Sequence, residues 1–244
     1  MKCLFEMLFS IGYALLMIFV WTVLFESSGQ SHIGGFTLQG IYAYFFLFTA
    51  VYYIAQSNIS HYIQNDVLDG TITAIMIRPV NYVMHLFIAS ISYMLVGAAA
   101  FSLPLLLIAV LIAHIPITAY SIALALLTLA VGFAVFWIVS FLIGTLAILM
   151  TRVYGIRYMV NILIYIVAGG TVPLSMFPQY LSNIVYALPF QDMGYLPVSI
   201  FLGTATPASI ANGLLVGTVW AVVLGIFAVF WWKRVKKSIT SVGG

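Results

Sequence analysis

The chain has 244 residues and a formal net charge of +3 at pH 7, and its composition is 64% hydrophobic and only 5% charged. Soluble domains are about 45–50% apolar and about 25% charged, so this composition excludes a soluble globular protein. The single cysteine, Cys3, excludes an intrachain disulfide. The long uncharged runs lack the period-two alternation of a membrane β-barrel, and helical backbone satisfies its own hydrogen bonds in lipid. We therefore predict an all-α integral membrane protein.

Six apolar runs are predicted to cross the membrane within one transmembrane domain, residues 1–244. A signal peptide starting at Lys2 is the alternative for the first run, which is however longer than a usual signal core and has no A-x-A-like cleavage site. The third and fourth runs would be about 45 Å long as helices against a hydrocarbon core of about 30 Å, so they must tilt, protrude or kink, the third at Pro104. The runs lie at about residues 7–26, 36–60, 83–112, 120–150, 158–172 and 208–232.

Residues 61–82 form the one sizeable polar segment between two long apolar runs. Gly70 and Pro79 bracket the sequence TITAIMIR, which can form only about two helical turns. An ordinary loop lying on the lipid headgroups is one interpretation. The other is a short helix whose apolar face needs a partner, because apolar residues recur at i, i+4, i+7 and i+8: Leu68, Ile72, Ile75 and Met76.

Residues 173–200 are apolar but repeatedly interrupted. Pro178, Pro189 and Pro197 break the segment, and Asp192 is its only charged residue. Such a segment is too interrupted to cross the membrane as one helix and too apolar to extend into water. We expect a re-entrant or interfacial hairpin before the last span.

The distribution of basic residues predicts the topology. With a cytoplasmic N-terminus, the cytoplasmic segments are the N-terminal residues, 61–82, 151–157 and the C-terminal tail, whereas the outside loops carry only Glu26 and Asp192. Positive charge is concentrated in the cytoplasmic loops of membrane proteins. We therefore expect both termini in the cytoplasm of a plasma-membrane protein, because these segments hold every lysine and arginine: Lys2, Arg78, Arg152, Arg157, Lys233, Arg234, Lys236 and Lys237.

Several kinds of chemistry have no signature in the sequence. No acidic residue lies inside a predicted span, since Glu26 is at the end of the first one, and this argues against ion-coupled transporters, pumps and intramembrane enzymes. The G-x-x-x-x-G-K-[ST] loop that would bind ATP is absent, as are zinc-type clusters and nucleic-acid-binding motifs. We expect no enzymatic activity and no cofactor or metal in this chain, and any energy for transport must come from another subunit or from the substrate gradient.

The polar residues within the spans are mild, and hydrogen bonding between neighbouring helices is their simplest interpretation. A substrate pathway is the alternative, and aromatic and hydroxyl groups would suit an amphipathic or lipid-like substrate. Gly169-Gly170 and Gly213-x-x-x-Gly217 are expected to mark close helix packing. The candidate pathway residues are Tyr42, Tyr52, Asn161 and Tyr165, of which the last two are one helical turn apart.

Two motifs resemble those of type-2 ABC transporter permeases, the exporter-type transmembrane subunits. The sequence G-G-T-V-P-L-S-M-F-P, followed by L-P-F at 188–190, resembles the exit of the fifth span and the re-entrant hairpin of that family. The pattern I-x-x-D-V-x-x-G-x-I-x-x-x-x-x-R-P-V-N resembles the loop between the second and third spans, here with Ile63, Asp66, Val67, Gly70, Ile72, Arg78, Pro79, Val80 and Asn81. Family members usually begin with a longer amphipathic segment than the residues before this first span.

The resemblance implies that 61–82 contains a coupling helix docked on a separate ABC ATP-binding subunit. Two such subunits would carry the ATP and Mg, and two permeases would pair as a homodimer or heterodimer in membrane lipid. The implied function is that of the permease of an ATP-driven exporter, with an ATP-independent channel, facilitator or substrate-capture component as the alternative. The implied coupling residues are Asp66, Leu68, Asp69, Gly70, Ile72, Ile75, Met76, Arg78 and Pro79.

Overall fold

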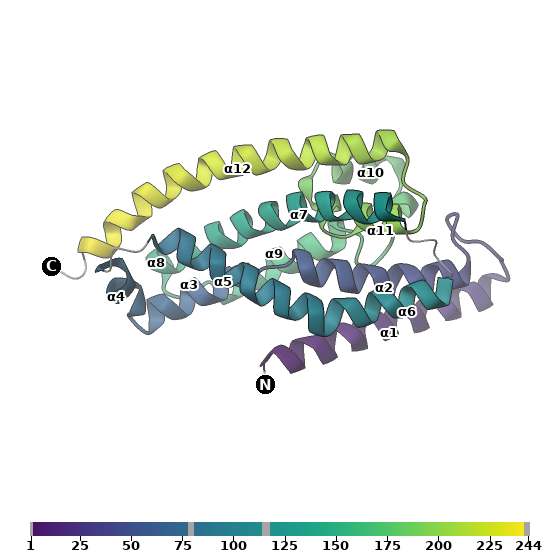
Figure 1. Ribbon diagram of the computed structural model, residues 1–244, viewed down its shortest axis with the longest axis horizontal. Helices are drawn as coiled ribbons and strands as arrows, with labels where there is room; N and C mark the ends of the chain where they lie inside the picture. Colours follow the sequence, from purple (N-terminus) through teal and green to yellow (C-terminus); the bar gives the residue numbers. More distant parts are fainter. Residues whose placement is uncertain (1, 78–80, 114–117, 242–244) are drawn as a thin grey trace.

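The computed structural model describes residues 2–77, 81–113 and 118–241 as an elongated bundle of helices (Figure 1). The described chain is helical apart from turns and one isolated bridge between Ile33 and Phe36, which confirms the all-α prediction. The helices are α1 (Lys2–Ser28), α2 (Leu38–Ala55), α3 (Ile59–Leu68), α4 (Thr71–Ile77), α5 (Tyr82–Gly97), α6 (Leu103–Ala113), α7 (Ala119–Thr145), α8 (Ala147–Met150), α9 (Tyr154–Val167), α10 (Gln179–Tyr186), α11 (Tyr195–Phe201) and α12 (Pro207–Ser241).

Five helical stretches of the described residues are long and apolar enough to cross a membrane. Helices α5 and α6 form one of these stretches, joined by a π-helical turn, η1 (Ala98–Ser102). Pro104 lies two residues after this turn, and its ring clashes with the carbonyl four residues earlier, which interrupts the normal hydrogen-bond ladder. Such wider turns are usual sites of helix bending, so the π-helical turn lies where a kink is expected. The stretches are Ile11–Ser28, Leu38–Ala55, Tyr82–Ile112, Ala119–Met150 and Pro207–Ile239.

The fifth predicted span differs from the others. Helix α9 has 14 residues, which is about 21 Å of helix and less than the hydrocarbon core of about 30 Å. The chain then turns at Gly169, whose φ of 98° favours glycine, and the Tyr44 hydroxyl donates to the Gly169 carbonyl at 2.9 Å. Farther along, the Tyr195 amide donates to the Ala168 carbonyl at 2.9 Å, so the returning chain meets the end of α9.

Residues 173–200 contain only short helices between α9 and α12. They comprise two 3₁₀ turns, η2 (Leu174–Met176) and η3 (Pro189–Met193), together with α10 and α11. In Figure 1, α10, α11 and the start of α12 lie at one end of the bundle, while α4 and the C-terminal end of α12 lie at the other. We call the first the α10 end and the second the α4 end.

Helix α2 lies at the centre of the main core. Thr37 caps its start by accepting a hydrogen bond from the Gly40 amide at 3.1 Å, and the aromatic run that follows is buried almost completely. The Tyr44 and Phe48 rings stack with their centroids 6.0 Å apart. This core joins α2 to α1, α7, α9 and α11.

A second core fixes α3 at the α4 end. A Cβ added at Gly144 of α7 would lie 2.8 Å from the Ser60 Cα, so the glycine permits α3 to contact the α7 backbone directly. The Ser140 hydroxyl donates to the Ser57 carbonyl at 3.1 Å and completes this contact. The buried members of the cluster come from α3, α4, α5, α7 and α12: Ile59, Ile63, Ile72, Tyr82, Leu86, Phe141, Ala228 and Ile239.

Replacing Gly144 by alanine tests this contact. We expect Gly144→Ala to destabilise the folded chain by about 1–3 kcal/mol, because overpacking a tight contact forces the backbone apart. The measurement is thermal unfolding of the purified chain in detergent. Gly225→Ala is the matched control, because a Cβ there meets only the Ile138 Cδ1, at 3.8 Å. Equal unfolding temperatures for the two variants would contradict the packing role of Gly144.

Candidate functional site

The turn between α3 and α4 is shaped by Gly70. The Gly70 φ of 71° lies in the left-handed region, which glycine adopts without steric cost. Gly70 comes directly after Asp69, the C-cap of α3, and a left-handed residue at this position ends the helix. The Thr73 hydroxyl donates to the Gly70 carbonyl at 2.7 Å and stabilises the start of α4. The sequence thus places a short helix, α4, at the tip of the bundle (Figure 1).

The structure corrects the direction of the predicted apolar face. Ile72 is only 4% exposed and lies in the second core, and Ile75 and Met76 pack against the same cluster. Leu68 is 45% exposed and Ile77 is 85% exposed. The predicted apolar face is therefore divided: the bundle itself covers Ile72 fully and Ile75 and Met76 in part, whereas Leu68 stays exposed.

Asp66 and Asp69 have different environments. The half-buried Asp66 accepts a hydrogen bond from the Tyr82 hydroxyl at 2.7 Å, and the Thr71 hydroxyl lies 3.4 Å from its carboxylate. Asp69 is exposed beside Gly70. Asp66 therefore holds the segment to the start of α5, whereas Asp69 is available at the surface.

The implied coupling residues Arg78 and Pro79 lie outside the described residues.

Aromatic stacking connects this segment to two long helices. The Tyr82 ring stacks on Trp232 of α12 with centroids 5.8 Å apart and planes 20° apart, and Trp232 meets Phe141 of α7 at 5.6 Å. Phe141 in turn stacks on Trp137 at 5.5 Å, and the Trp137 indole donates to Ser90 of α5 at 3.0 Å. Sequence reasoning missed this stack because Trp231 and Trp232 also fit an interfacial aromatic belt.

A second connection runs from α3 to α9. The buried Gln64 side chain accepts a hydrogen bond from the Val153 amide at 3.0 Å, immediately before α9 begins. A backbone amide at the N-cap has no partner within the helix. Gln64 therefore supplies the acceptor from another element and ties the start of α9 to α3.

Two of the four candidate pathway residues come together. The Tyr52 and Tyr165 rings meet edge to face at 5.1 Å, and Tyr13 of α1 packs against Tyr165 at 5.4 Å. Tyr42 lies elsewhere on α2, where its hydroxyl is 2.8 Å from the Thr22 hydroxyl of α1. Asn161 is half-buried on α9, one turn before Tyr165. The aromatic cluster thus joins α1, α2 and α9.

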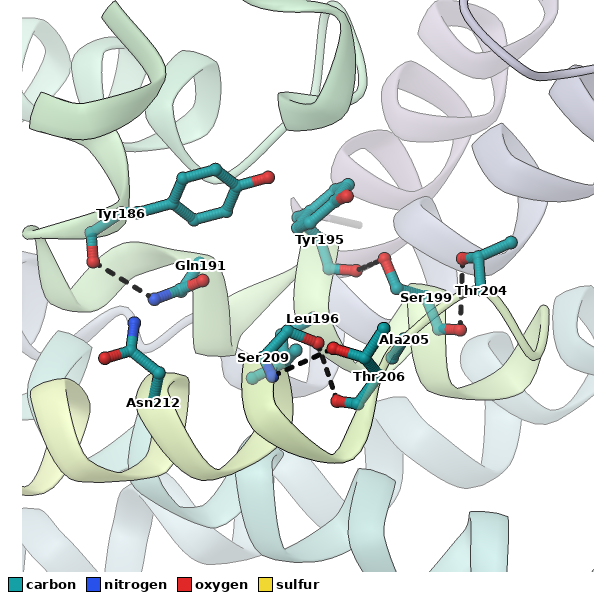
Figure 2. Close-up of a pocket in the computed structure, with 10 residues that line it drawn as sticks. All are labelled: Tyr186, Gln191, Tyr195, Leu196, Ser199, Thr204, Ala205, Thr206, Ser209 and Asn212. Carbon is teal, nitrogen blue, oxygen red and sulfur yellow. Dashed lines mark hydrogen bonds between the residues drawn. The ribbon is translucent and has the colours of Figure 1, made fainter. Parts of the chain in front are cut away.

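A neutral polar pocket of about 340 Å³ opens at the α10 end (Figure 2). The Gln191 amide donates to the Tyr186 carbonyl at 3.3 Å, and the Ser199 hydroxyl donates to the Tyr195 carbonyl at 2.8 Å. Amides and hydroxyls can bind water or a neutral polar group. The described lining has no charged residue and consists of Tyr186, Gln191, Tyr195, Leu196, Ser199, Thr204, Ala205, Thr206, Ser209 and Asn212.

Within the part of the chain that the structure describes, no group of three or more His, Cys, Asp or Glu residues could hold a metal ion.

Comparison with known proteins gives the family. No curated protein matches the chain. A family model described as ABC-2 family transporter protein matches residues 11–243 and so covers the α3–α4 segment, the aromatic cluster and the polar pocket. The chain therefore belongs to the ABC-2 family of transporter proteins, as a multi-pass membrane subunit of the permease type.

Proposed function

We propose that this permease subunit works in an ATP-driven exporter and receives its mechanical input through the α3–α4 segment. The observation that carries the proposal is the two-sided structure of the α3–α4 segment. Its inner side, at Ile72 of α4, is fixed in the bundle, while Leu68 at the end of α3, Asp69 in the turn and Ile77 at the end of α4 are exposed at the tip. An ABC ATP-binding subunit is the general partner of this family, and an exposed apolar tip with a nearby acid suits such a partner.

The charge distribution supports a cytoplasmic location for this tip. Ile239 near the end of α12 shares the second core with Ile72, so the basic residues 233–237 lie at the same end of the bundle as α4. Basic residues favour the cytoplasmic side. We therefore place both termini in the cytoplasm and the subunit in the plasma membrane, with ATP and Mg on two partner ATPases and a second permease completing the assembly as a homodimer or heterodimer.

The two connections described above supply routes from the tip to the spans. The stack of Tyr82, Trp232 and Phe141 reaches α12 and α7, and the bond between Gln64 and Val153 reaches α9. Closure of the ATPases would displace α3 and α4 and favour one of two packed arrangements of the bundle, as alternating access requires. The aromatic cluster on α1, α2 and α9 suits an amphipathic or lipid-like substrate on its way outward.

Acidic substitutions at the tip test the docking surface. We expect Leu68→Asp and Ile77→Asp each to weaken binding of the ATP-binding subunit by at least about tenfold, because each removes apolar contact area from the interface and adds a charge. The measurement is co-purification of a P-loop ATPase from native membranes, together with its ATP hydrolysis. Ser31→Asp is the control, since it adds the same charge to the exposed loop between α1 and α2.

An undiminished complex in both tip variants would contradict the docking surface. Flux through the reconstituted chain alone, without nucleotide, would instead favour an ATP-independent channel or facilitator. Ile72→Asp has a different expected result: it should lower the unfolding temperature of the chain itself, because it buries a charge in the second core.

Removing the Tyr82 hydroxyl tests transmission. Tyr82→Phe keeps the ring on Trp232 but loses the bond to Asp66, and we expect it to destabilise the segment by about 1–2 kcal/mol. In the assembled transporter, ATP hydrolysis should continue while transport per ATP falls. Tyr62→Phe, on the exposed side of α3, is the control. If both variants transport as the unchanged chain does, the Tyr82 contact has no part in coupling.

A further inference from the structure

Asp192 is a buried carboxyl group that the proposed transport cycle does not use. It lies in η3 with 0% of its surface exposed, and η3 packs between α7 and α12. Neither carboxyl oxygen has a hydrogen-bond partner among the described residues. Burying a polar group without a partner is costly, and burying an unpaired charge is more costly still. The carboxyl group must therefore have a specific environment that tolerates it.

Glycines from two helices form a slot around this residue. A Cβ at Gly132 of α7 would lie 2.6 Å from the Asp192 carbonyl oxygen, and one at Gly213 of α12 would lie 3.1 Å from its Oδ1. A Cβ at Gly217 would overlap with Oδ2. The expected close packing at Gly213-x-x-x-Gly217 thus receives a carboxyl group, and any larger residue at these positions would displace it.

The helices described around the slot provide no countercharge. Tyrosines are the titratable residues on α2, α10 and α11, and residues 207–232 of α12 and all of α7 contain no charged residue. On α9 the one charge, Arg157, is in the first turn, far along the chain from the Ala168 end that meets the re-entrant segment. Burial raises the pKa of Asp192 to about 8. The carboxyl group is therefore protonated in this packing at neutral pH.

Water has a short route to this group. Gln191, the neighbouring residue, lines the polar pocket together with Asn212, and Figure 2 shows these two side chains at one end of it. The Gln191 Cδ and the Asp192 Oδ1 both approach the Gly213 position, at 3.7 Å and 3.1 Å from its ideal Cβ. A small separation of α12 from η3 would connect the slot to the pocket.

We propose that the slot between η3, α7 and α12 is a proton-binding site centred on Asp192. It holds the proton while the helices are packed as here, and it releases the proton into the polar pocket when α12 moves away. The step is the ionisation of one carboxylic acid to a carboxylate and a proton. This inference goes beyond the proposed function and does not depend on it, because both tests below need neither nucleotide nor ATPase.

The direction of the pH effect follows from the two states. In the packed state the group titrates near pH 8, and once opened to water it returns toward its ordinary value of 3.8. The open state therefore binds fewer protons between about pH 4 and pH 8, so the equilibrium constant for opening rises by up to about tenfold per pH unit in this window. Below the window both states are protonated and above it both are ionised, so the effect ends.

Carbodiimide labelling tests the protonated state directly. The O–H of a carboxylic acid adds across one C=N bond of the reagent, with oxygen going to carbon and the proton to nitrogen, and acyl transfer then gives a stable N-acylurea. In native membrane vesicles at pH 6, we expect dicyclohexylcarbodiimide to label Asp192 in preference to the exposed Asp69, and labelling to fall at least several-fold at pH 9. A water-soluble cationic carbodiimide should show the reverse preference. Absence of labelling at pH 6, or equal labelling by both reagents, would overturn the proposal.

Asp192→Asn supplies the second test, because it keeps the shape of the side chain and removes the proton. The unfolding temperature of the purified unchanged chain should fall as the pH rises from 5 to 8, and this slope should be lost in the variant. Glu26→Gln, an exposed acid at the end of α1, is the matched control and should retain the slope. A slope that persists in Asp192→Asn would show that the proton is bound elsewhere. Should the variant fail to fold, the labelling experiment on the unchanged chain decides the question.

Discussion

The close approach of other segments to α7 is the constraint on which the rest of the structure depends. Gly144 lets α3 contact the α7 backbone near one end, and Gly132 lets the backbone of η3 do so farther along. The two glycines are about 18 Å apart along the helix, at about 1.5 Å per residue. Helix α7 therefore contacts both α3 and η3 without an intervening layer of side chains. A shift of α7 along or about its axis changes both contacts at once.

Helix α12 shares both of these contacts. Near its C-terminal end Trp232 stacks on Tyr82 and meets Phe141 edge to face, and near its N-terminal end Gly213 and Gly217 face Asp192. The pair formed by α7 and α12 is thus fixed at the α4 end by aromatic packing and at the α10 end by a buried carboxyl group. Aromatic packing is insensitive to pH, whereas the carboxyl contact is favoured only while protonated. The two ends of the same helix pair therefore respond to different signals.

The sequence predicted the architecture better than the contacts. Five of the predicted spans appear as long apolar helices, because length and hydrophobicity suffice to identify them. Helix α9 is short because Gly169 turns the chain, and the sequence showed this interruption without showing that η3 and α11 return to Ala168. The sequence predicts that Ile72 contacts a separate ATP-binding subunit, whereas the structure buries it in the second core. Periodicity defines an apolar face but leaves open what covers it. Asp192 was counted as a loop charge, since only the fold brings Gly132 and Gly213 around it.

The two-sided form of the α3–α4 segment suits the coupling role that we propose for it. A helix that contacts only the partner would move without moving the spans, and one buried entirely in the bundle would receive no force. Helix α4 is short enough for Ile72 to lie in the second core while Ile77 projects from it. Because cores are close-packed, displacement of the tip is passed to Tyr82 and Phe141 and is not absorbed locally. Under this proposal, substitutions of the inner residues should change the stability of the chain, whereas substitutions of the outer residues should change recognition of the partner.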